Sequence, residues 1–337
     1  MKAYERPVVA NFVVTRNCNI DCVFCGVEHM SNHRGADADL GTARRVVDEL
    51  QRAGVLRINY FGGEPLFYRG FLELAEYVRS EGFFTSIVTN GRLITRDNVV
   101  HLTQLINAWG VSLHGMSNFH DKITRRRGAF WDTVSKIRLL KEHASQMTVN
   151  MTVTETDYTE IPALIEFMYS ECGVDSFSLN RCIGRVPENL PQEFVPGDVS
   201  VSSDSLVKSL YLIDDICTRH PDVDVQYAIH FPYCIVPERR LLKYVGSCGV
   251  GTSYFGVDVL GNVQFCSYTT GVIGNLFETD LVDIWSNARE YVEFRQEDWM
   301  PEACKACEYK LTCMSGCKVS RGTGTFGPDM LLEPVGR

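Results

Sequence analysis

The sequence predicts an α/β fold in which a partial (β/α)6, TIM-like barrel is followed by a smaller, cysteine-rich C-terminal domain. In the first two thirds of the chain, short apolar runs alternate with amphipathic stretches, which is typical of a parallel sheet flanked by helices. A polar, Pro-rich segment at 186–203 interrupts this alternation. The chain beyond residue 246 is rich in cysteine, glycine and turn-forming residues, which favours a domain held together by metal rather than by an apolar core.

Six strands alternate with helices in the predicted barrel. Apolar runs predict the strands at 7–15, 56–61, 84–89, 108–113, 147–153 and 176–179. Apolar positions at helical spacing predict the helices at 39–54, 71–81, 99–105, 129–143 and 161–168. A later helix is expected at 205–218, and short strands at 254–259 and 262–266. These elements give a barrel over residues 1–185, a linker with a helical segment over 186–245, and a cysteine-rich domain with its tail over 246–337.

Charge and cysteine content narrow the class of protein. The formal net charge is -9 and the basic residues are scattered, which argues against a nucleic-acid partner. No stretch approaches the ~20 apolar residues of a membrane span, and the N-terminus lacks an apolar signal core, so a cytoplasmic protein is expected. Thirteen cysteines in such a chain are candidates for metal ligands rather than for disulfides.

The first cysteine group follows the first predicted strand directly. Cys18, Cys22 and Cys25 have the spacing C-x3-C-x2-C. Three thiolates in one short loop can ligate three irons of a cubane and leave the fourth iron open to an external ligand. The alternative is a zinc loop, which His29 or His33 would complete.

With Phe24 just before its last cysteine, this loop resembles that of the radical S-adenosylmethionine (SAM) enzymes. The resemblance implies a [4Fe–4S] cluster on Cys18, Cys22 and Cys25, with SAM bound to the open iron. It also implies an enzyme that cleaves SAM to a 5′-deoxyadenosyl radical and receives its electron from a flavodoxin- or ferredoxin-type donor.

Further positions at strand ends fit the same family. Active sites of α/β barrels lie at the carboxyl ends of the strands. By resemblance, the GGEP string holds the methionine amino group, and the expected cofactor contacts are Phe24, Gly62, Gly63, Glu64, Pro65, Asn90, Ser112 and Arg127. The alternative is that Arg127 has no cofactor contact and lies in a solvated basic turn. His114 departs from the family pattern, and is either a substrate contact or a structural histidine.

The second cysteine group has the pattern C-x12-G-x4-C, then C-x2-C-x5-C-x3-C. This string resembles the SPASM extension of radical SAM enzymes, which implies one or two auxiliary [4Fe–4S] clusters; a zinc ribbon is the alternative. By analogy, the first cluster has Cys248, Cys266 and Cys317 as ligands, and the second has Cys304, Cys307 and Cys313. The family's usual seventh cysteine is missing after Cys317, so a fourth ligand could come from Asp329, Glu333, an unplaced cysteine, water or the substrate.

The resemblance leaves several reactions open. Only seventeen residues precede Cys18, which favours a small-molecule substrate over a peptide that needs its own binding domain. The expectation is a hydroxylated sugar, aminocyclitol or sugar nucleoside of antibiotic biosynthesis, undergoing alcohol dehydrogenation or redox-neutral dehydration or decarboxylation, as an oxidoreductase or lyase would perform. The alternative is a ribosomal-peptide-modifying enzyme that forms a thioether or carbon cross-link, or an epimer. Epimerisation needs a hydrogen-donating thiol, for which Cys182 is the candidate; otherwise Cys182 is a buried core cysteine.

Overall fold

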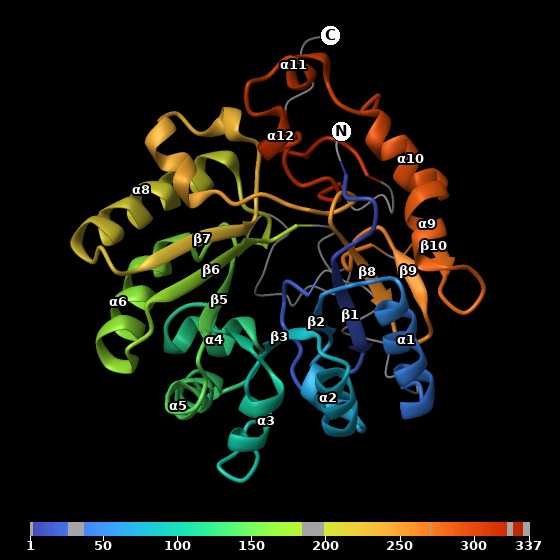
Figure 1. Ribbon diagram of the computed structural model, residues 1–337. Helices are drawn as coiled ribbons and strands as arrows, with labels where there is room; N and C mark the ends of the chain where they lie inside the picture. The colour runs from blue at the N-terminus through green and yellow to red at the C-terminus, as the bar shows by residue number, and fades with distance from the viewer. Residues whose placement is uncertain (1–2, 26–36, 184–198, 270, 322–325, 333–337) are drawn as a thin grey trace.

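The sheet of this molecule runs through almost the whole chain. The computed structural model describes residues 3–25, 37–183, 199–269, 271–321 and 326–332. In this part of the chain, ten strands form one sheet in the order β10-β9-β8-β1-β2-β3-β4-β5-β6-β7. Figure 1 shows the sheet at the centre, with helices along its outer side.

Six central strands form the barrel that the sequence predicts. Each pairs in parallel with its neighbours, so the carboxyl ends of all six lie at the same edge. They are β1 (Val9–Thr15), β2 (Arg57–Gly62), β3 (Phe84–Thr89), β4 (Ala108–Ser112), β5 (Met147–Val153) and β6 (Ser176–Arg181). The predicted α/β fold with a partial (β/α)6 barrel is therefore confirmed.

The helices bury one apolar stripe each against this sheet. In α1 (Leu40–Arg52), Asp39 caps the N-terminus through Thr42 N at 3.0 Å, and Ala43, Val46, Val47 and Leu50 are buried at helical spacing. The other barrel helices are α2 (Phe71–Ser80), α3 (Val99–Leu105), α4 (Ser117–Ile123), α5 (Ala129–Lys141), α6 (Ile161–Cys172) and α8 (Ser203–Arg219). Short 3-10 turns are η1 (Pro65–Phe67), η2 (Tyr158–Glu160), η3 (Tyr233–Ile235) and η4 (Arg239–Tyr244).

Strands at both edges of the expected barrel extend the sheet, β7 on one side and β8, β9 and β10 on the other. β7 (Asp224–Ile229) pairs with β6 in the region where the sequence predicts only a linker and a helix. β8 (Tyr254–Asp258) pairs in parallel with β1, with Tyr254 opposite Val9. The sheet is therefore continuous across the boundaries expected near residues 185 and 245.

The C-terminal segment has an aromatic core of its own. Phe265, Trp285, Tyr291 and Phe294 are buried, with ring centroids 4.6 Å apart for Trp285 and Tyr291. The sequence favoured metal over an apolar core for this segment, whereas the structure shows an apolar core beside the cysteines. The core was missed because its aromatic residues come from short elements with no common period. These elements are β9 (Asn262–Gln264), β10 (Val272–Asn275), α9 (Leu281–Asn287), α10 (Arg289–Gln296), α11 (Glu302–Lys305) and α12 (Lys310–Cys313).

No helix in the described ranges combines the length and the apolar character that crossing a bilayer requires.

Candidate active site

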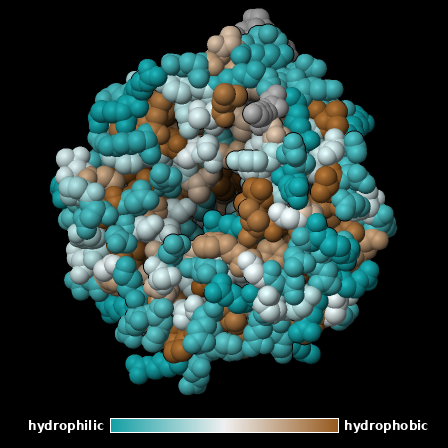
Figure 2. Space-filling model, viewed as in Figure 1, coloured by the Kyte–Doolittle hydropathy of each residue, from teal (hydrophilic) through white to brown (hydrophobic). Residues whose placement is uncertain are grey.

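A cavity of about 190 Å³ opens at the carboxyl ends of the barrel strands. Figure 2 shows that the face viewed in Figure 1 is hollowed near its middle. The lining brings together most of the site residues expected from the sequence, namely Cys18, Cys22, Phe24, Cys25, Gly62, Gly63, Glu64, Asn90, Ser112, His114 and Cys182. Residues that are far apart in the chain therefore form one site.

The three cysteines of the first group all line this cavity. Their loop is tied to α4 by a hydrogen bond from Val23 N to Ile123 O of 3.0 Å. Burial raises the pKa of the Cys18 thiol. Burial raises the pKa of the Cys22 thiol well above its ordinary value, and the nearby Cys25 and Cys18 thiols add to this shift. Three crowded thiolates need a cationic partner, and an iron–sulfur cluster supplies one.

A single metal ion fits this arrangement less well. Within the described ranges, no three His, Cys, Asp or Glu side chains come close enough to hold one ion. His29 and His33, the possible zinc ligands, lie outside the described residues. The three thiols around one cavity instead fit a cluster of several irons, each thiol binding a different iron.

Gly62 and Gly63 let the GGEP turn lie directly against the cysteine loop. Gly63 N donates to Thr15 O at 2.9 Å, and Glu64 N donates to Asn17 O at 2.9 Å. A Cβ atom on Gly62 or Gly63 would lie 2.2 Å from the Thr15 or Asn17 carbonyl oxygen, respectively. The approach of the two loops therefore requires glycine at both positions.

Glu64 connects this turn to the end of β3. Its carboxylate accepts hydrogen bonds from Leu66 N at 3.1 Å, Thr89 Oγ1 at 2.7 Å and Asn90 N at 2.7 Å. Burial raises its pKa to about 7, although all three donors favour the ionised form. Since a carboxylate has about four acceptor positions, one remains for a ligand such as an ammonium group.

Asn90 and Phe24 place the cysteine loop relative to the strands. Asn90 Nδ2 donates to Asn19 Oδ1 at 2.6 Å and lies 4.0 Å from Cys18 Sγ. The Phe24 ring packs edge-on against His114, with centroids 4.7 Å apart. Both residues therefore hold the loop against the strand ends.

His114 is a neutral, fixed imidazole at the cavity wall. Its Nδ1 accepts from Thr152 N at 3.1 Å, so its proton lies on Nε2. Burial holds the pKa of His114 well below its ordinary value, and His120 lowers it further. His114 can thus donate one hydrogen bond to a ligand without carrying charge.

Cys182 follows β6 and lines the same cavity as the first cysteine group. Its backbone N donates to Val153 O at 3.0 Å, which fixes it at the strand end. Burial raises the pKa of its thiol to about 12, so the thiol stays protonated at neutral pH.

Two of the expected cofactor contacts do not line the cavity, and several lining residues were not expected from the sequence. Arg127 is exposed and Pro65 is buried, and neither lines the cavity. The lining adds Asn150 and Thr152, which lie two residues apart on β5, and Tyr268 from the C-terminal segment. Asn150 and Thr152 could have been predicted, because they are polar residues two positions apart near the end of a strand. Nothing in the local sequence marks Tyr268 as a site residue.

The auxiliary cysteines separate into two further cavities. Cys248, Cys266 and Cys317 line one of about 320 Å³. Cys304, Cys307 and Cys313 line another, of about 650 Å³. These groups are the two triplets expected by analogy. The first cavity shares Ile183, Ile229 and Tyr268 with the active-site cavity, so the two adjoin.

Comparison with known proteins agrees with this architecture. Residues 12–168 match the radical SAM superfamily, and residues 248–308 match SPASM, an iron–sulfur cluster-binding domain. PqqA peptide cyclase of Bradyrhizobium diazoefficiens is 22% identical, covering 93% of this chain and 81% of its own. AdoMet-dependent heme synthase of Methanosarcina barkeri is 25% identical, covering 97% and 95%. The structure of Streptococcus suis SuiB bound to S-adenosylmethionine has a TM-score of 0.75 at 20% identity, covering 97% of this chain and 77% of SuiB.

Proposed function

Since the chain is an enzyme that carries a radical SAM domain and a SPASM domain, we propose that it modifies a peptide by abstracting hydrogen from an unactivated C–H bond. With SAM bound, the cluster supplies a 5′-deoxyadenosyl radical. A flavodoxin- or ferredoxin-type protein delivers the electron for this cleavage.

The residues around the cavity bind and orient the reactants. Cys18, Cys22 and Cys25 hold the cluster, and the turn at Gly62 and Gly63 brings backbone to the adjoining space. The remaining acceptor position of Glu64 suits the methionine ammonium group, and Nε2–H of His114 is available to a carbonyl or hydroxyl oxygen.

The observation that carries the peptide assignment is the relative named PqqA peptide cyclase. It matches 93% of this chain, which includes both the barrel and the C-terminal extension. The relatives give no support to the expected sugar, aminocyclitol or nucleoside of antibiotic biosynthesis. We therefore prefer the peptide alternative, and the small-molecule reading becomes an outcome of the test.

Cys182 supports return of a hydrogen atom to the peptide. Its protonated thiol lines the cavity that holds the cluster cysteines. Once a hydrogen atom has been removed from the peptide carbon, the Cys182 thiol would give one back to the opposite face. An electron from an external reductant and a proton from solvent then restore the thiol. This sequence inverts the carbon, which favours epimerisation over cross-linking.

Co-expression tests the peptide assignment. Each short peptide encoded beside the enzyme's gene is first produced in a bacterial host in H2O. The cells are then transferred to D2O, the enzyme is induced, and the peptides are analysed by mass spectrometry. We expect one peptide to gain a single deuterium at a modified residue. The assignment is refuted if every peptide is unchanged while a tetrapyrrole or a hydroxylated sugar stimulates 5′-deoxyadenosine formation by the purified enzyme.

A further inference from the structure

Cys234 lies outside both expected cysteine groups, in the short turn η3. In the structure it lines the 650 Å³ cavity together with Cys304, Cys307 and Cys313. Four thiols around one cavity match the four cysteines of a fully ligated [4Fe–4S] cluster. We propose that Cys234 is the fourth ligand of the auxiliary cluster held by Cys304, Cys307 and Cys313.

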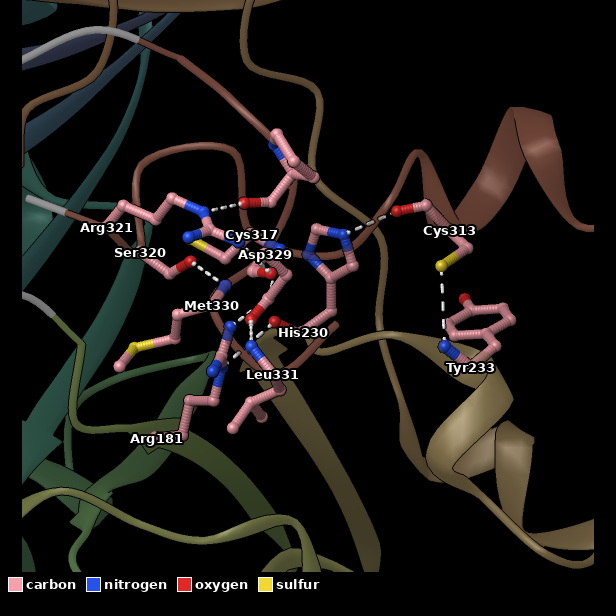
Figure 3. Close-up of polar contacts among 11 residues, drawn as sticks. Arg181, His230, Tyr233, Cys313, Cys317, Ser320, Arg321, Asp329, Met330 and Leu331 are labelled. Atoms are coloured by element: carbon pink, nitrogen blue, oxygen red, sulfur yellow. Dashed lines mark hydrogen bonds and ion pairs between the residues drawn. The ribbon is translucent and has the colours of Figure 1, made fainter. Parts of the chain in front are cut away.

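The contacts of η3 hold it against the cysteine-bearing segment. Tyr233 N donates to Cys313 Sγ at 3.4 Å, and the Tyr233 ring lies edge-on to Tyr309 with centroids 5.6 Å apart. His230 Nε2 lies 3.0 Å from the Cys313 carbonyl oxygen. Figure 3 shows that both residues reach Cys313, His230 at its carbonyl oxygen and Tyr233 at its sulfur. The residue that follows Tyr233 is therefore fixed beside α12.

Electrostatic coupling gives a second sign that the thiols are neighbours. Burial raises the pKa of Cys234, and the Cys304 and Cys307 thiols raise it further. Cys234 and Cys304 in turn raise the pKa of Cys313, after burial. A cysteine that binds iron does so as a thiolate, so each ligand releases its proton on binding.

The other candidates for the fourth ligand fit less well. Asp329 lies outside this cavity lining, and its carboxylate is already engaged by Arg181, Cys317 N and Leu331 N. Glu333 lies outside the described residues. A single zinc ion is disfavoured as well, because no three such ligands in the described part of the chain are close enough for one ion.

A cluster with four cysteine ligands has no open iron. It is therefore confined to electron transfer, whereas the cluster at Cys248, Cys266 and Cys317 has three thiols and adjoins the active-site cavity. This inference rests on the SPASM domain and is independent of the substrate, so failure of the peptide test would leave it standing.

Alkylation of the wild-type protein tests the ligand directly. Iron-loaded protein is treated with iodoacetamide under nitrogen, before and after removal of iron, and each cysteine is quantified by mass spectrometry. Cys234 is exposed without the cluster, so we expect protection with iron and modification after its removal, as for Cys307. Cys217, which is half-buried in α8, serves as the control and should react equally in both states. Equal modification of Cys234 in both states, or zinc in place of iron, would overturn the proposal.

A variant gives an independent readout. In a background with Cys18, Cys22 and Cys25 replaced by Ala, about eight irons should remain in two cubanes. Adding Cys234→Ala should release about one iron and give a [3Fe–4S] electron paramagnetic resonance signal after oxidation. Cys217→Ala in the same background should change neither. The same iron content and spectrum for both variants would refute the assignment.

Discussion

Asp157 is a buried carboxyl group that the proposed chemistry does not use. Its Oδ1 accepts a hydrogen bond from Thr154 N, whereas its Oδ2 is buried with no partner among the described residues. Burial raises the pKa of Asp157 well above its ordinary value. The native state therefore binds this proton more tightly than the unfolded state, and this residue's contribution to stability falls as pH rises above about 4.

Replacing Asp157 with Asn should remove the fall in stability that this residue causes as the pH rises. We expect Asp157→Asn to raise the free energy of unfolding at pH 8 by about 1–3 kcal/mol, and to change it less at pH 5, because the variant has no charge to bury. Urea unfolding under nitrogen at both pH values measures this. The exposed Asp97→Asn is the control, and an equal effect of both variants at pH 8 would contradict the account.

Cys182 supplies the hydrogen atom in the proposed reaction. Cys182→Ala should still form 5′-deoxyadenosine from SAM, but should lose at least 100-fold in deuterium incorporation into the peptide in D2O. Single-turnover mass spectrometry measures both products. Cys172→Ala, at the end of α6 and outside the cavity lining, should behave as wild type. Normal incorporation by Cys182→Ala would remove the hydrogen-donor role.

At the scale of elements, the sequence predicted those strands and helices that have a clear apolar period. All six barrel strands were expected, because each is an apolar run bounded by turn residues. Helix α4 and strand β7 were missed. The buried residues of α4 are only His120 and Ile123, which form no apolar stripe, and β7 has polar residues at alternate positions, with Asp224 and Gln226 exposed. The two auxiliary cysteine triplets were expected from the resemblance to the SPASM extension, but the position of Cys234 depends on how η3 packs against α12, which no local pattern encodes.

The contact between the GGEP turn and the cysteine loop gives a prediction about an element pair. Gly63→Ala would place a Cβ atom 2.2 Å from Asn17 O, so the loop that carries Cys18 must shift. We expect about four of twelve irons to be lost while the auxiliary clusters remain. Iron counting with Mössbauer spectra measures the loss. Gly327→Ala, where nothing lies within 4 Å of the added atom, should keep the full iron content. Full iron in Gly63→Ala would show that the two loops need not meet so closely.

Across the whole molecule, one buried ion pair ties the barrel to the C-terminal tail. Arg181, at the end of β6, pairs with Asp329, and both are almost fully buried. Asp329 also accepts from Cys317 N at 2.7 Å. Figure 3 shows these groups converging, so the active-site wall, an auxiliary cysteine and the tail share one network.

Removing one partner of this buried ion pair should lower the free energy of unfolding more than replacing both partners. Asp329→Ala leaves the Arg181 charge buried without its partner, which we expect to cost about 3–5 kcal/mol of unfolding free energy. Adding Arg181→Met to this variant should recover part of the loss. A double-mutant cycle by urea unfolding measures the coupling. The exposed pair Arg289 and Glu293 is the control, worth less than about 1 kcal/mol. A cost for Asp329→Ala no larger than that of the control would contradict a coupled network.

Of the three cysteine-lined cavities in the described part of the chain, the one lined by Cys18, Cys22 and Cys25 is the proposed site of SAM cleavage. The most direct measurement is 5′-deoxyadenosine formation from SAM and dithionite by the anaerobically reconstituted enzyme and by its triple Ala variant at these positions. We predict formation by the wild type and none by the variant, which should keep about eight of about twelve irons. Equal formation by both proteins would contradict the assignment of the radical-forming cluster to these three cysteines.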